Sequence, residues 1–302
     1  MPMVTGGFAN LLTKDFEKIF FDEYMRQPEE YKTIAKMSNE STHYVREGDM
    51  TGLGAMQEMA EAQAIPFETF EQQNEKKVYF TNFGLGVQFS RNMYDDDLTG
   101  HMKKAIAELG KSAAYTRDLR FWDVINSGEL AAAAGGRDGL DGQPLFSAAH
   151  PLTGMAVGNT YSNIVDAALS KTSLEGACDL FEGMVNDRGI PIVMKPKVLL
   201  VPYQLKWKAK ELLESVLDPE SANNTVNTLK GEGLKYQVVH YLTDSDACYL
   251  VGGDHDLRFM WRKPAAFKGT DDFNTDNALF KGTMRFQTSF FHWRGVVKIT
   301  GG

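Results

Sequence analysis

Residues 95–128 read DDDLTGHMKKAIAELGKSAAYTRDLRFWDVINSG. The acids Asp95–Asp97 favour the start of a helix, because carboxylates complement its positive N-terminal end, and Gly128 is typical of a helix stop. Apolar side chains recur at helical spacing between these ends, at Leu98, Met102, Ile106, Leu109, Ala113, Trp122 and Ile125. The pattern predicts one helix from about 97 to 126, which at ~1.5 Å per residue would be on the order of 45 Å long. Such a helix is longer than a compact domain usually needs and is suited to serve as a spine.

An acidic stretch precedes this helix. Residues 47–75 hold seven acids and neither lysine nor arginine. A 29-residue loop of this kind has little reason to stay ordered alone. Its methionines favour two interpretations equally, an adaptable binding surface or a loop folded on its own protein. The stretch leads to FGLGVQFS, residues 83–90, where apolar residues alternate with small or polar ones as in a half-buried strand.

The two ends of the chain also carry regular patterns. The first 40 residues predict an arm with one helix, whose apolar face consists of Phe16, Ile19, Phe20 and Tyr24. Near the other end, MRFQTSFFHWRGVVKI, residues 284–299, predicts long terminal strand structure. Met284, Phe286 and Phe290 lie on one side of this pattern, and Arg285, Gln287 and Ser289 lie on the other.

Residues 171–252 alternate helical and strand patterns. Thr172 and Glu175 have the spacing of a capping box, and Gly189 indicates the end of that first helix. A second helix is predicted from Leu205, Ala209, Leu212, Leu213 and Val216. The strand candidates are KVLLVP (197–202), KYQVVHY (235–241) and ACYLV (247–251). This alternation predicts a compact α/β unit.

The segment GLDGQPLFSAAHPLTG, residues 139–154, contains the residue types of a hydrolytic site. Ser147 and His150 are only three residues apart, whereas a nucleophile and its base normally come from separate parts of a fold. The glycines that flank a hydrolase serine are also missing. We therefore interpret the segment as a turn-rich loop in which Ser147 and His150 shape the backbone, so that alanine at either would cost on the order of 1 kcal/mol.

Other candidate sites in the sequence are weak. Asp244, Asp246, Asp254, His255 and Asp256 have side chains that bind metals, but they flank an apolar strand and are typical of solvated turns. The segment DFNTDN, residues 272–277, resembles a calcium loop but lacks its glycine and its last glutamate. Cys178 and Cys248 have no zinc-finger spacing and are expected to be small buried side chains. The sequence predicts no catalytic, cofactor-binding or metal-binding residues.

Composition excludes several classes of protein. The chain has 302 residues, of which 43% are hydrophobic and 24% charged, as in a folded soluble protein. The net charge of −8 argues against binding nucleic acid through the overall field. The apolar runs are too short for a membrane span, and the first residues do not form a secretory signal. We expect the chain to remain in the cytoplasm of the cell that makes it.

The order of these parts resembles the major capsid protein of tailed bacteriophages, and more closely the Mu-like phage and prophage major head subunit. Five stretches carry the resemblance, in the order of the family: DGQPLFSAAHP (141–151), KVLLVPYQLKWKAKELLES (197–215), DPESANNTVNTLKG (218–231), DACYLVGG (246–253) and DDFNTDNALFKGTMRFQTSFFHWRG (271–295). They cover most of residues 138–295, whereas the first 137 residues match mainly by layout.

The resemblance implies an α+β chain with the Hong Kong 97-like capsid fold. Residues 1–40 would be the N-terminal arm and residues 41–91 the extended loop and its strands. Residues 92–170 would form the peripheral domain with the spine helix, residues 171–258 the axial domain, and residues 259–302 the return strands of the peripheral domain. Many relatives begin with a scaffolding segment that a protease removes. This chain begins almost directly with the arm, as expected if scaffolding is a separate protein or the chain is the mature form.

The resemblance also implies a function. Copies of the protein would form the hexamers and pentamers of an icosahedral shell, assembled in the bacterial host cytoplasm and present in the virion capsid. Scaffolding, portal and decoration proteins would be partners, double-stranded DNA would be contacted only non-specifically, and no enzyme activity, cofactor or membrane would be involved. The alternatives are a phage tail or tube protein, which would form rings, and a soluble α/β hydrolase, which would need a third group near His150 or Asp254.

The charge pattern suggests how copies would meet. The acidic stretch of one subunit, including Glu58, Glu61 and Glu68, would lie across a basic surface of the next. The candidate basic residues are Lys103, Lys104, Lys111, Arg117 and Arg120 on the spine helix, and Arg258, Arg262, Lys263 and Lys268 near the return strands. Exposed pairs are each worth only ~0–1 kcal/mol, so the hypothesis relies on their repetition around every subunit.

Overall fold

The computed structural model describes residues 9–50, 52–56, 58–61, 63–67, 72–90, 100–152, 158–217, 226–271 and 277–301. The chain divides into two compact units. The spine unit comprises Met1–Val45, Val78–Phe121 and Phe259–Thr288, and the α/β unit comprises Arg46–Lys77, Trp122–Arg258 and Ser289–Gly302. In the described parts of the chain, no helix has the length and apolar character needed to cross a membrane.

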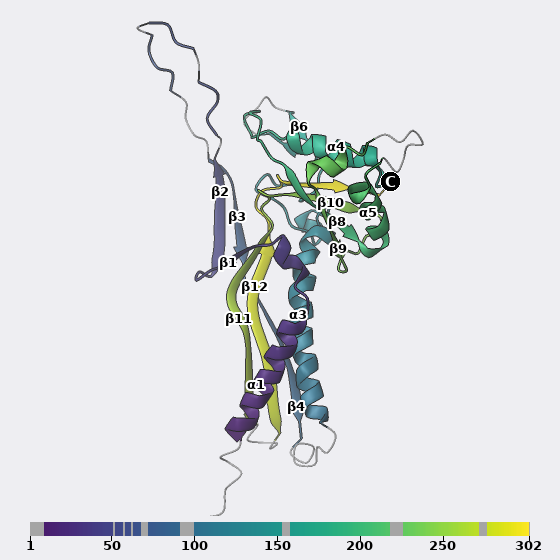
Figure 1. Ribbon diagram of the computed structural model, residues 1–302. Coiled ribbons are helices and arrows are strands. Elements are labelled where there is room, and N and C mark those ends of the chain that lie inside the picture. The colour runs from purple at the N-terminus through teal and green to yellow at the C-terminus, as the bar shows by residue number, and fades with distance from the viewer. Residues whose placement is uncertain are drawn as a thin grey trace, which may run out of the picture. The chain divides into compact units, whose positions relative to one another are not determined.

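The spine unit is built from a four-stranded sheet and two long helices (Figure 1). The strand order is β1 (Lys36–Asn39), β11 (Arg258–Asp271), β12 (Ala278–Ser289) and β4 (Thr81–Phe89). The helices are α1 (Ala9–Arg26) and α3 (His101–Asn126), and a short 3-10 helix, η2, spans Glu30–Thr33. Strands β4 and β12 are antiparallel, with Met284 opposite Phe83 and Phe280 opposite Val87. The predicted arm helix and the predicted strand at 83–90 are both confirmed.

Helix α3 confirms most of the predicted spine. It begins at His101 instead of near 97, because Gly100 has a φ of 70° and is not helical. Residues 91–99, which include the three acids of the predicted start, lie outside the described residues. Met102, Ile106, Leu109, Trp122 and Ile125 are buried, as their spacing predicts. The helix has 26 residues and therefore spans about 39 Å at ~1.5 Å per residue.

Aromatic side chains fill the core between the sheet and the two helices. Phe16 of α1 meets Phe280 of β12 edge to face, with ring centroids 5.2 Å apart, and Phe20 lies 5.3 Å from Phe267 of β11. Helix α3 adds Met102, Ile106 and Leu109 to the same core. Gly110 allows α1 and α3 to approach closely, because a Cβ at this position would lie 2.5 Å from the carbonyl oxygen of Phe20.

The α/β unit contains a five-stranded sheet in the order β7 (Ile164–Val165), β13 (Val296–Ile299), β10 (Cys248–Gly252), β8 (Pro196–Pro202) and β9 (Lys235–Val239). Strand β10 is antiparallel to β8 and β13, whereas β8 and β9 are parallel. Helices α4 (Lys171–Glu182) and α5 (Lys206–Glu214) contribute to its core through Leu174, Phe181 and Leu212. The described residues of this unit also form the 3-10 helices η3 (Ala132–Ala134), η4 (Tyr203–Leu205) and η5 (Leu229–Glu232). The alternation of helix and strand over residues 171–252 is confirmed.

Three local predictions in this unit are wrong. The capping box of α4 is formed by Ser170 and Ser173 instead of Thr172 and Glu175, because the helix starts two residues earlier than predicted. The same helix ends before Gly183, and Gly189 instead occupies a later turn with a φ of 76°. Helix α5 stops at Glu214, so that Val216 is 64% exposed instead of buried.

Two short ladders complete the fold. Strands β2 (Tyr44–Met50) and β3 (Gln72–Tyr79) pair at the base of the acidic stretch, and β5 (His150–Pro151) pairs with β6 (Thr160–Tyr161). The predicted terminal strand structure corresponds to two strands, β12 and β13, which lie in different sheets. Phe290, which the prediction placed within a strand, lies in the segment between them and is fully buried.

Candidate functional site

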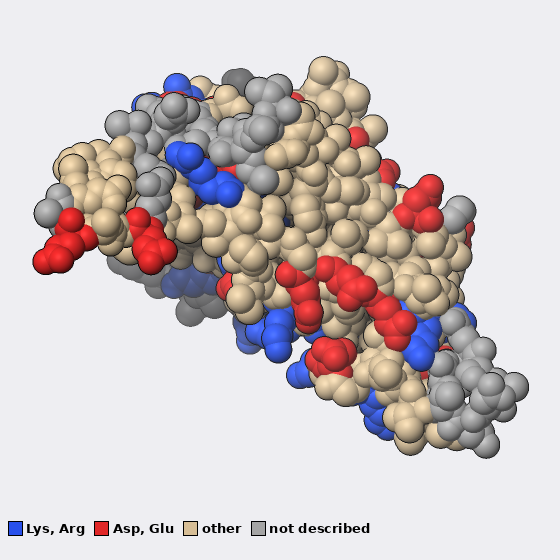
Figure 2. Space-filling model, turned by 90° about the horizontal axis from the view of Figure 1, so that it is seen from above, with Lys and Arg blue, Asp and Glu red and all other residues tan. Residues whose placement is uncertain are grey.

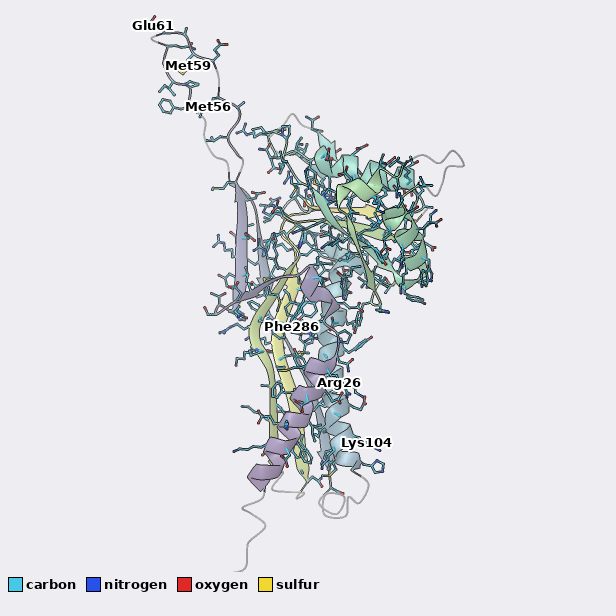
Figure 3. All side chains as sticks on the ribbon, in the orientation of Figure 1. Arg26, Met56, Met59, Glu61, Lys104 and Phe286 are labelled. Carbon is cyan, nitrogen blue, oxygen red and sulfur yellow. The ribbon has the colours of Figure 1, made fainter. Side chains whose placement is uncertain are left out.

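The acidic loop, defined as residues 51–71 between β2 and β3, presents apolar side chains to solvent. The described residues of this loop include Met56, which is fully exposed, and Phe67, which is 93% exposed. Leu53, Met59 and Ile65 are also exposed. Figure 3 shows Met56, Met59 and Glu61 along the part of the loop that extends away from β2 and β3. Because exposing so many large apolar groups is unfavourable in water, the loop has the character of a binding surface.

The base of the loop is anchored by Lys76, a residue of β3. Its Nζ atom donates to the Ser289 hydroxyl at 3.1 Å and to the Phe290 carbonyl at 2.5 Å. The same Nζ lies 4.6 Å from the centre of the Phe290 ring and 5.5 Å from that of Phe291. Burial lowers the pKa of Lys76 to about 8. Since these contacts hold the charged end of the side chain, the base of the loop is fixed although its far part is exposed.

Ion pairs add to this anchor. Glu47 lies 2.9 Å from Arg258, whose guanidinium also contacts Asp256, and Glu75 pairs with both Arg46 and Lys77. Glu47 and Glu75 are therefore paired within their own subunit, and Asp49 lies 3.9 Å from His292, which corrects the expectation that the whole acidic stretch faces a neighbour. Glu58 and Glu61 are exposed, and Glu68 and Glu71 lie outside the described residues.

The candidate basic surface on the spine helix also needs correction. Arg117 is 1% exposed, so it is part of the core and not of a surface. Lys111 is paired with Glu108 on the same helix at 2.7 Å. Lys103, Lys104 and Arg120 remain exposed, and acidic and basic side chains are interspersed on the face drawn in Figure 2. Only part of the predicted basic stripe along α3 is therefore available to a partner.

Arg117 belongs to a buried polar cluster. Its Nη1 lies 2.6 Å from the Glu29 carboxylate and its Nη2 lies 3.2 Å from that of Asp118. The guanidinium also stacks near Tyr24 and Tyr31, 4.8 and 5.1 Å from the ring centres. Burial raises the pKa of Asp118 to about 6, although the charge of Arg117 acts in the opposite direction. The cluster ties the chain after α1 to the spine helix.

The buried carboxyl of Asp118 predicts a pH dependence of stability. Its pKa is about 6 in the folded protein against an ordinary value of 3.8, so the folded state binds the proton more tightly than the unfolded state does. The resulting stability is present below pH 4 and is lost as the pH rises through 6. Relative to Asp118→Asn, which lacks this titration, the wild type should lose roughly 1–3 kcal/mol of unfolding free energy between pH 4 and pH 7. Urea unfolding of both unassembled proteins at each pH measures the difference, and parallel pH curves would contradict the prediction.

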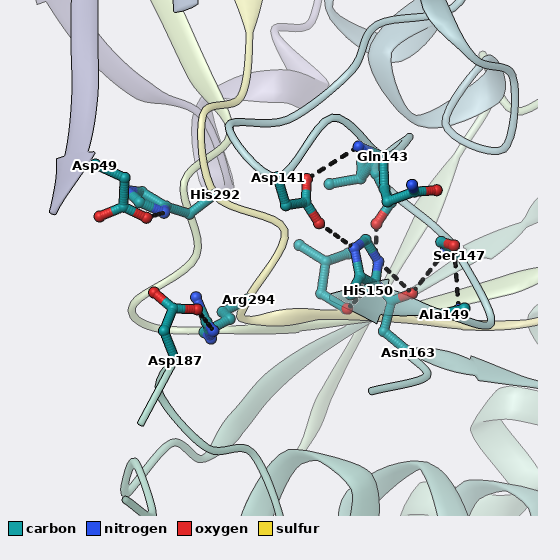
Figure 4. Close-up of polar contacts among 12 residues, drawn as sticks. Asp49, Asp141, Gln143, Ser147, Ala149, His150, Asn163, Asp187, His292 and Arg294 are labelled. Carbon is teal, nitrogen blue, oxygen red and sulfur yellow. Dashed lines mark hydrogen bonds and ion pairs between the residues drawn. The ribbon is translucent and has the colours of Figure 1, made fainter. Parts of the chain in front are cut away.

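The segment around His150 forms a closed polar network (Figure 4). The His150 ring is fully buried, with Nδ1 2.6 Å from Asp141 and Nε2 3.2 Å from Oδ1 of Asn163. The ring stacks on Trp293 with centroids 4.1 Å apart. The Asn163 amide nitrogen donates to the carbonyls of Leu145 and Val296, which fixes its oxygen toward the imidazole. Both ring nitrogens of His150 therefore face oxygen acceptors.

Ser147 takes no part in a nucleophile and base pair. Its hydroxyl accepts from the backbone N–H of Ala149 at 3.2 Å, and its own N–H donates to Asn163 at 3.0 Å. A general base needs a free nitrogen lone pair directed at the nucleophile, and His150 directs both nitrogens elsewhere. The turn chemistry is confirmed, because Asp141 accepts from the N–H of Gln143 and Gly142 has a φ of 74°. The residues predicted to shape this loop do so through hydrogen bonds.

The buried position of His150 raises the expected cost of removing it. His150→Ala would remove one hydrogen-bond partner from each of Asp141 and Asn163 and open a cavity beside Trp293, so we expect a loss of about 2–4 kcal/mol in unfolding free energy. The half-buried Ser147 is the matched control, and Ser147→Ala should cost about 1 kcal/mol or less. Urea titration of the unassembled variants measures both values. An ester hydrolase activity that disappears in His150→Ala would contradict the structural role.

The remaining candidate residues also have structural roles. Asp244 accepts from the N–H groups of Asp246 and Ala247, as predicted for a turn. Asp256 is not solvated: it is nearly buried and accepts from the N–H groups of Phe291 and His292. Among the described residues, no group of three or more His, Cys, Asp or Glu side chains is arranged to hold a metal ion. Residues 272–276 of the calcium-like segment lie outside the described residues.

The two cysteines differ in burial. Cys248 is fully buried, and desolvation raises the pKa of its thiol to about 12. Cys178 is half-buried, and desolvation likewise raises its pKa to about 11. Both thiols are therefore protonated near neutral pH and act as small apolar side chains.

Sequence reasoning missed several of these partners. Asn163 and Trp293 lie far along the chain from His150, and no local pattern indicates their contact. The sequence does indicate that Arg117 is buried, because this residue continues the helical stripe formed by Ile106, Ala113 and Phe121. No pattern in the sequence indicates the anchoring role of Lys76, since a lysine near the end of an acidic stretch is usually solvated.

Comparisons with known proteins agree with this architecture. A curated relative, the Mu-like prophage FluMu major head subunit of Haemophilus influenzae, is 27% identical over 178 residues, which cover 57% of this chain and 54% of the relative. The match thus spans about half the length of that relative. Among solved structures, the capsid of bacteriophage JBD30 decorated with minor capsid protein trimers has a TM-score of 0.57 at 18% identity, over 80% of this chain and all of that one. The capsid of Cyanophage P-SCSP1u has a TM-score of 0.58 at 8% identity, over 89% and 86%.

The structural likenesses confirm the expected Hong Kong 97-like capsid fold. A family model described as phage capsid protein matches residues 74–299, well over half of the sequence. The matched range includes most of β3, the spine helix and every strand of the five-stranded α/β sheet. The chain therefore belongs to the phage capsid protein family.

Proposed function

We propose that the protein is the major capsid protein of a tailed bacteriophage or prophage, and that its copies assemble into the icosahedral shell that encloses the genome. The observation that carries this proposal is the acidic loop, which is anchored at its base through Lys76 and exposes Met56 and Phe67. A rigidly rooted, apolar segment of this kind gains stability by covering a second copy. Many moderate contacts of this type, made at once, stabilise an assembly far more than any one contact does.

The parts of the chain acquire roles under this proposal. Residues 1–40 act as an arm, and residues 41–91 as the extended loop with its strands. Residues 92–170 and 259–302 form the peripheral domain around the spine helix, and residues 171–258 form the axial domain. The subunits meet in hexamers and pentamers. Scaffolding, portal and decoration proteins are partners, and packaged double-stranded DNA is contacted without sequence preference.

The proposed role is structural, with assembly in the bacterial host cytoplasm. The His150 network supports it, because the neighbouring Ser147 is held by backbone groups and not activated. A role in shell building requires that residues 139–152 be held stably, and a closed network of buried hydrogen bonds supports this.

Electron microscopy of the purified full-length protein tests the proposed function. Closed shells are the expected result, with the acidic loop in contact with a neighbouring subunit. Stacked rings or tubes would instead favour a tail or tube protein. Stable monomers with esterase activity would favour the hydrolase alternative and overturn the proposal.

A further inference from the structure

The side chain of Asn163 has one orientation that satisfies its neighbours. Its amide nitrogen lies 2.8 Å from the carbonyl oxygen of Leu145 and 3.2 Å from that of Val296, and carbonyl oxygens only accept hydrogen bonds. Its amide oxygen lies 3.0 Å from the backbone nitrogen of Ser147, which only donates. Turning the amide around would put like groups against each other in all three places. The amide oxygen therefore faces Nε2 of His150 at 3.2 Å, and this nitrogen must carry a hydrogen.

The second ring nitrogen of His150 faces a carboxylate. Nδ1 lies 2.6 Å from Oδ2 of Asp141, a short distance that is typical of a hydrogen bond between charged groups. The other oxygen of Asp141 accepts from the backbone N–H of Gln143, so both oxygens act as acceptors, as in an ionised carboxylate. Nδ1 must then carry a hydrogen as well. Because an imidazole with hydrogens on both nitrogens is a cation, the contacts of the ring require a buried ion pair of His150 with Asp141.

The face of the ring also lies against a group that attracts positive charge. His150 stacks on Trp293 with ring centroids 4.1 Å apart and 11° between the planes, and Tyr161 stacks on the same indole at 5.6 Å. The π-system of an indole attracts cations, most strongly where water is excluded. Since His150 and Asn163 are both fully buried, water has no access to these contacts.

The other charged groups near the ring do not contact it. Charged or titratable side chains on the segments packed around the network are Asp49, Lys76, Tyr161, Asp187, His292 and Arg294. Arg294 pairs with Asp187 at 2.7 Å. Asp49 lies 3.9 Å from His292 (Figure 4). Within the described part of the chain, Asp141 is the only carboxylate that contacts this ring, so the charge of the ring depends on one partner.

We propose that His150 is held as an imidazolium at neutral pH, and that its proton locks residues 139–152 to strand β13 through Asn163. Once the proton leaves, one ring nitrogen faces an acceptor without a hydrogen to share. Either the bond to Asn163 is then lost, or a lone pair meets the carboxylate of Asp141. Asn163 cannot turn to compensate, because two carbonyl groups already fix its amide. Rising pH should therefore release this segment from the sheet. The lock lies within one subunit and goes beyond the proposed function, so that either can fail without the other.

Nitrogen-15 NMR of the unassembled full-length subunit, labelled in its histidine rings, measures the charge. At pH 7.5 both ring nitrogens of His150 should have the chemical shifts of protonated nitrogens. His255, which is also buried, is an internal control: its Nδ1 accepts from the backbone N–H of Leu257 at 3.1 Å, so this nitrogen should have the shift of a bare one. The His150 signals are assigned by their loss in His150→Gln or, if this variant does not fold, by replacing the histidines that are not buried. A neutral ring at His150 at pH 7.5 would overturn the proposal.

A carboxylate-to-amide substitution tests the origin of the charge. Asp141→Asn keeps the size of the side chain, and its new NH2 group can donate to a bare Nδ1. His150 should then be neutral at pH 7.5, with its hydrogen on Nε2 toward Asn163. Asp187→Asn, which removes the same charge from the neighbouring pair with Arg294, is the matched control and should leave both nitrogens protonated. A doubly protonated ring in Asp141→Asn, or a neutral ring in the control, would contradict the proposed ion pair.

The locking role predicts a difference in stability at alkaline pH. The urea midpoint of the wild type should fall relative to that of Asp141→Asn between pH 7 and pH 10, by roughly 0.5 M or more, because only the wild type loses a proton from this network. Both proteins keep Asp118, so its titration cancels in the difference, and Asp187→Asn should follow the wild type. The NMR signals of His150 should show the loss of one proton over the same pH range. Parallel midpoints over this range would mean that the proton does not lock the segment, and the proposal would fail.

Discussion

Deleting residues 50–72 should leave a folded, soluble subunit that no longer closes into shells. The deletion joins Asp49 to Gln73 and removes the exposed apolar residues of the acidic loop, including Met56 and Phe67. The anchors at the base, Lys76 and the pair of Glu47 with Arg258, remain. Because no connecting residues remain, the last residues of β2 and β3 must leave the ladder to form the turn, so we expect a loss of about 1–2 kcal/mol in unfolding free energy but a subunit that still folds. Electron microscopy and sedimentation of the purified deletion variant measure shell formation.

A variant of unchanged length separates the chemistry of the loop from its presence. Replacing Met56, Met59 and Phe67 by serine keeps the connection but removes the apolar surface, and it should reduce the yield of shells at least tenfold. Urea unfolding of the unassembled subunit should give the wild-type midpoint within error. Shells of normal size and yield from the deletion variant would show that the loop is not an assembly element.

The regular elements of the fold could be predicted because they follow periodic patterns. The stripe from Met102 to Ile125 indicates α3, and the alternation from Phe83 to Phe89 indicates β4. The ends of the helices were less predictable, because neighbouring residues of similar chemistry can each serve as the cap. Ser170 and Ser173 cap α4 instead of Thr172 and Glu175, and both pairs have the required spacing.

The contacts of the candidate surfaces could be predicted only in part. The acidity and methionines of the loop indicate a surface in need of a partner, and the exposed Met56 agrees with that interpretation. Which acids remain free depends on long-range pairs such as Glu47 with Arg258, which are 211 residues apart.

Replacing Arg117 should destabilise the subunit more than replacing His150 or Ser147. Arg117→Met keeps much of the side-chain volume but leaves the buried Asp118 without its cation, and Glu29 keeps only its pair with Lys32. Removing one partner of a buried ion pair typically costs about 3–5 kcal/mol, because the remaining charge is uncompensated. We expect a loss of this size in the unfolding free energy at pH 7.5, measured by urea unfolding of the unassembled subunit. Lys103→Met, on the exposed start of the same helix, is the control and should change stability by less than about 0.5 kcal/mol.

The carboxylates that lose their cation, and not the lost packing, should account for most of the loss of unfolding free energy in Arg117→Met. Adding Glu29→Gln and Asp118→Asn to Arg117→Met removes both charges, and replacing a whole buried ion network is often close to neutral. The triple variant should therefore regain at least half of the stability lost by Arg117→Met. Acidification tests the same idea without the two carboxylate substitutions, because protonation of Asp118 removes its buried charge. The loss of unfolding free energy in Arg117→Met should therefore be smaller at pH 5 than at pH 7.5. A deficit that persists in the triple variant and does not depend on pH would mean that Arg117 stabilises the spine through its stacking on Tyr24 and Tyr31 instead of through its charge.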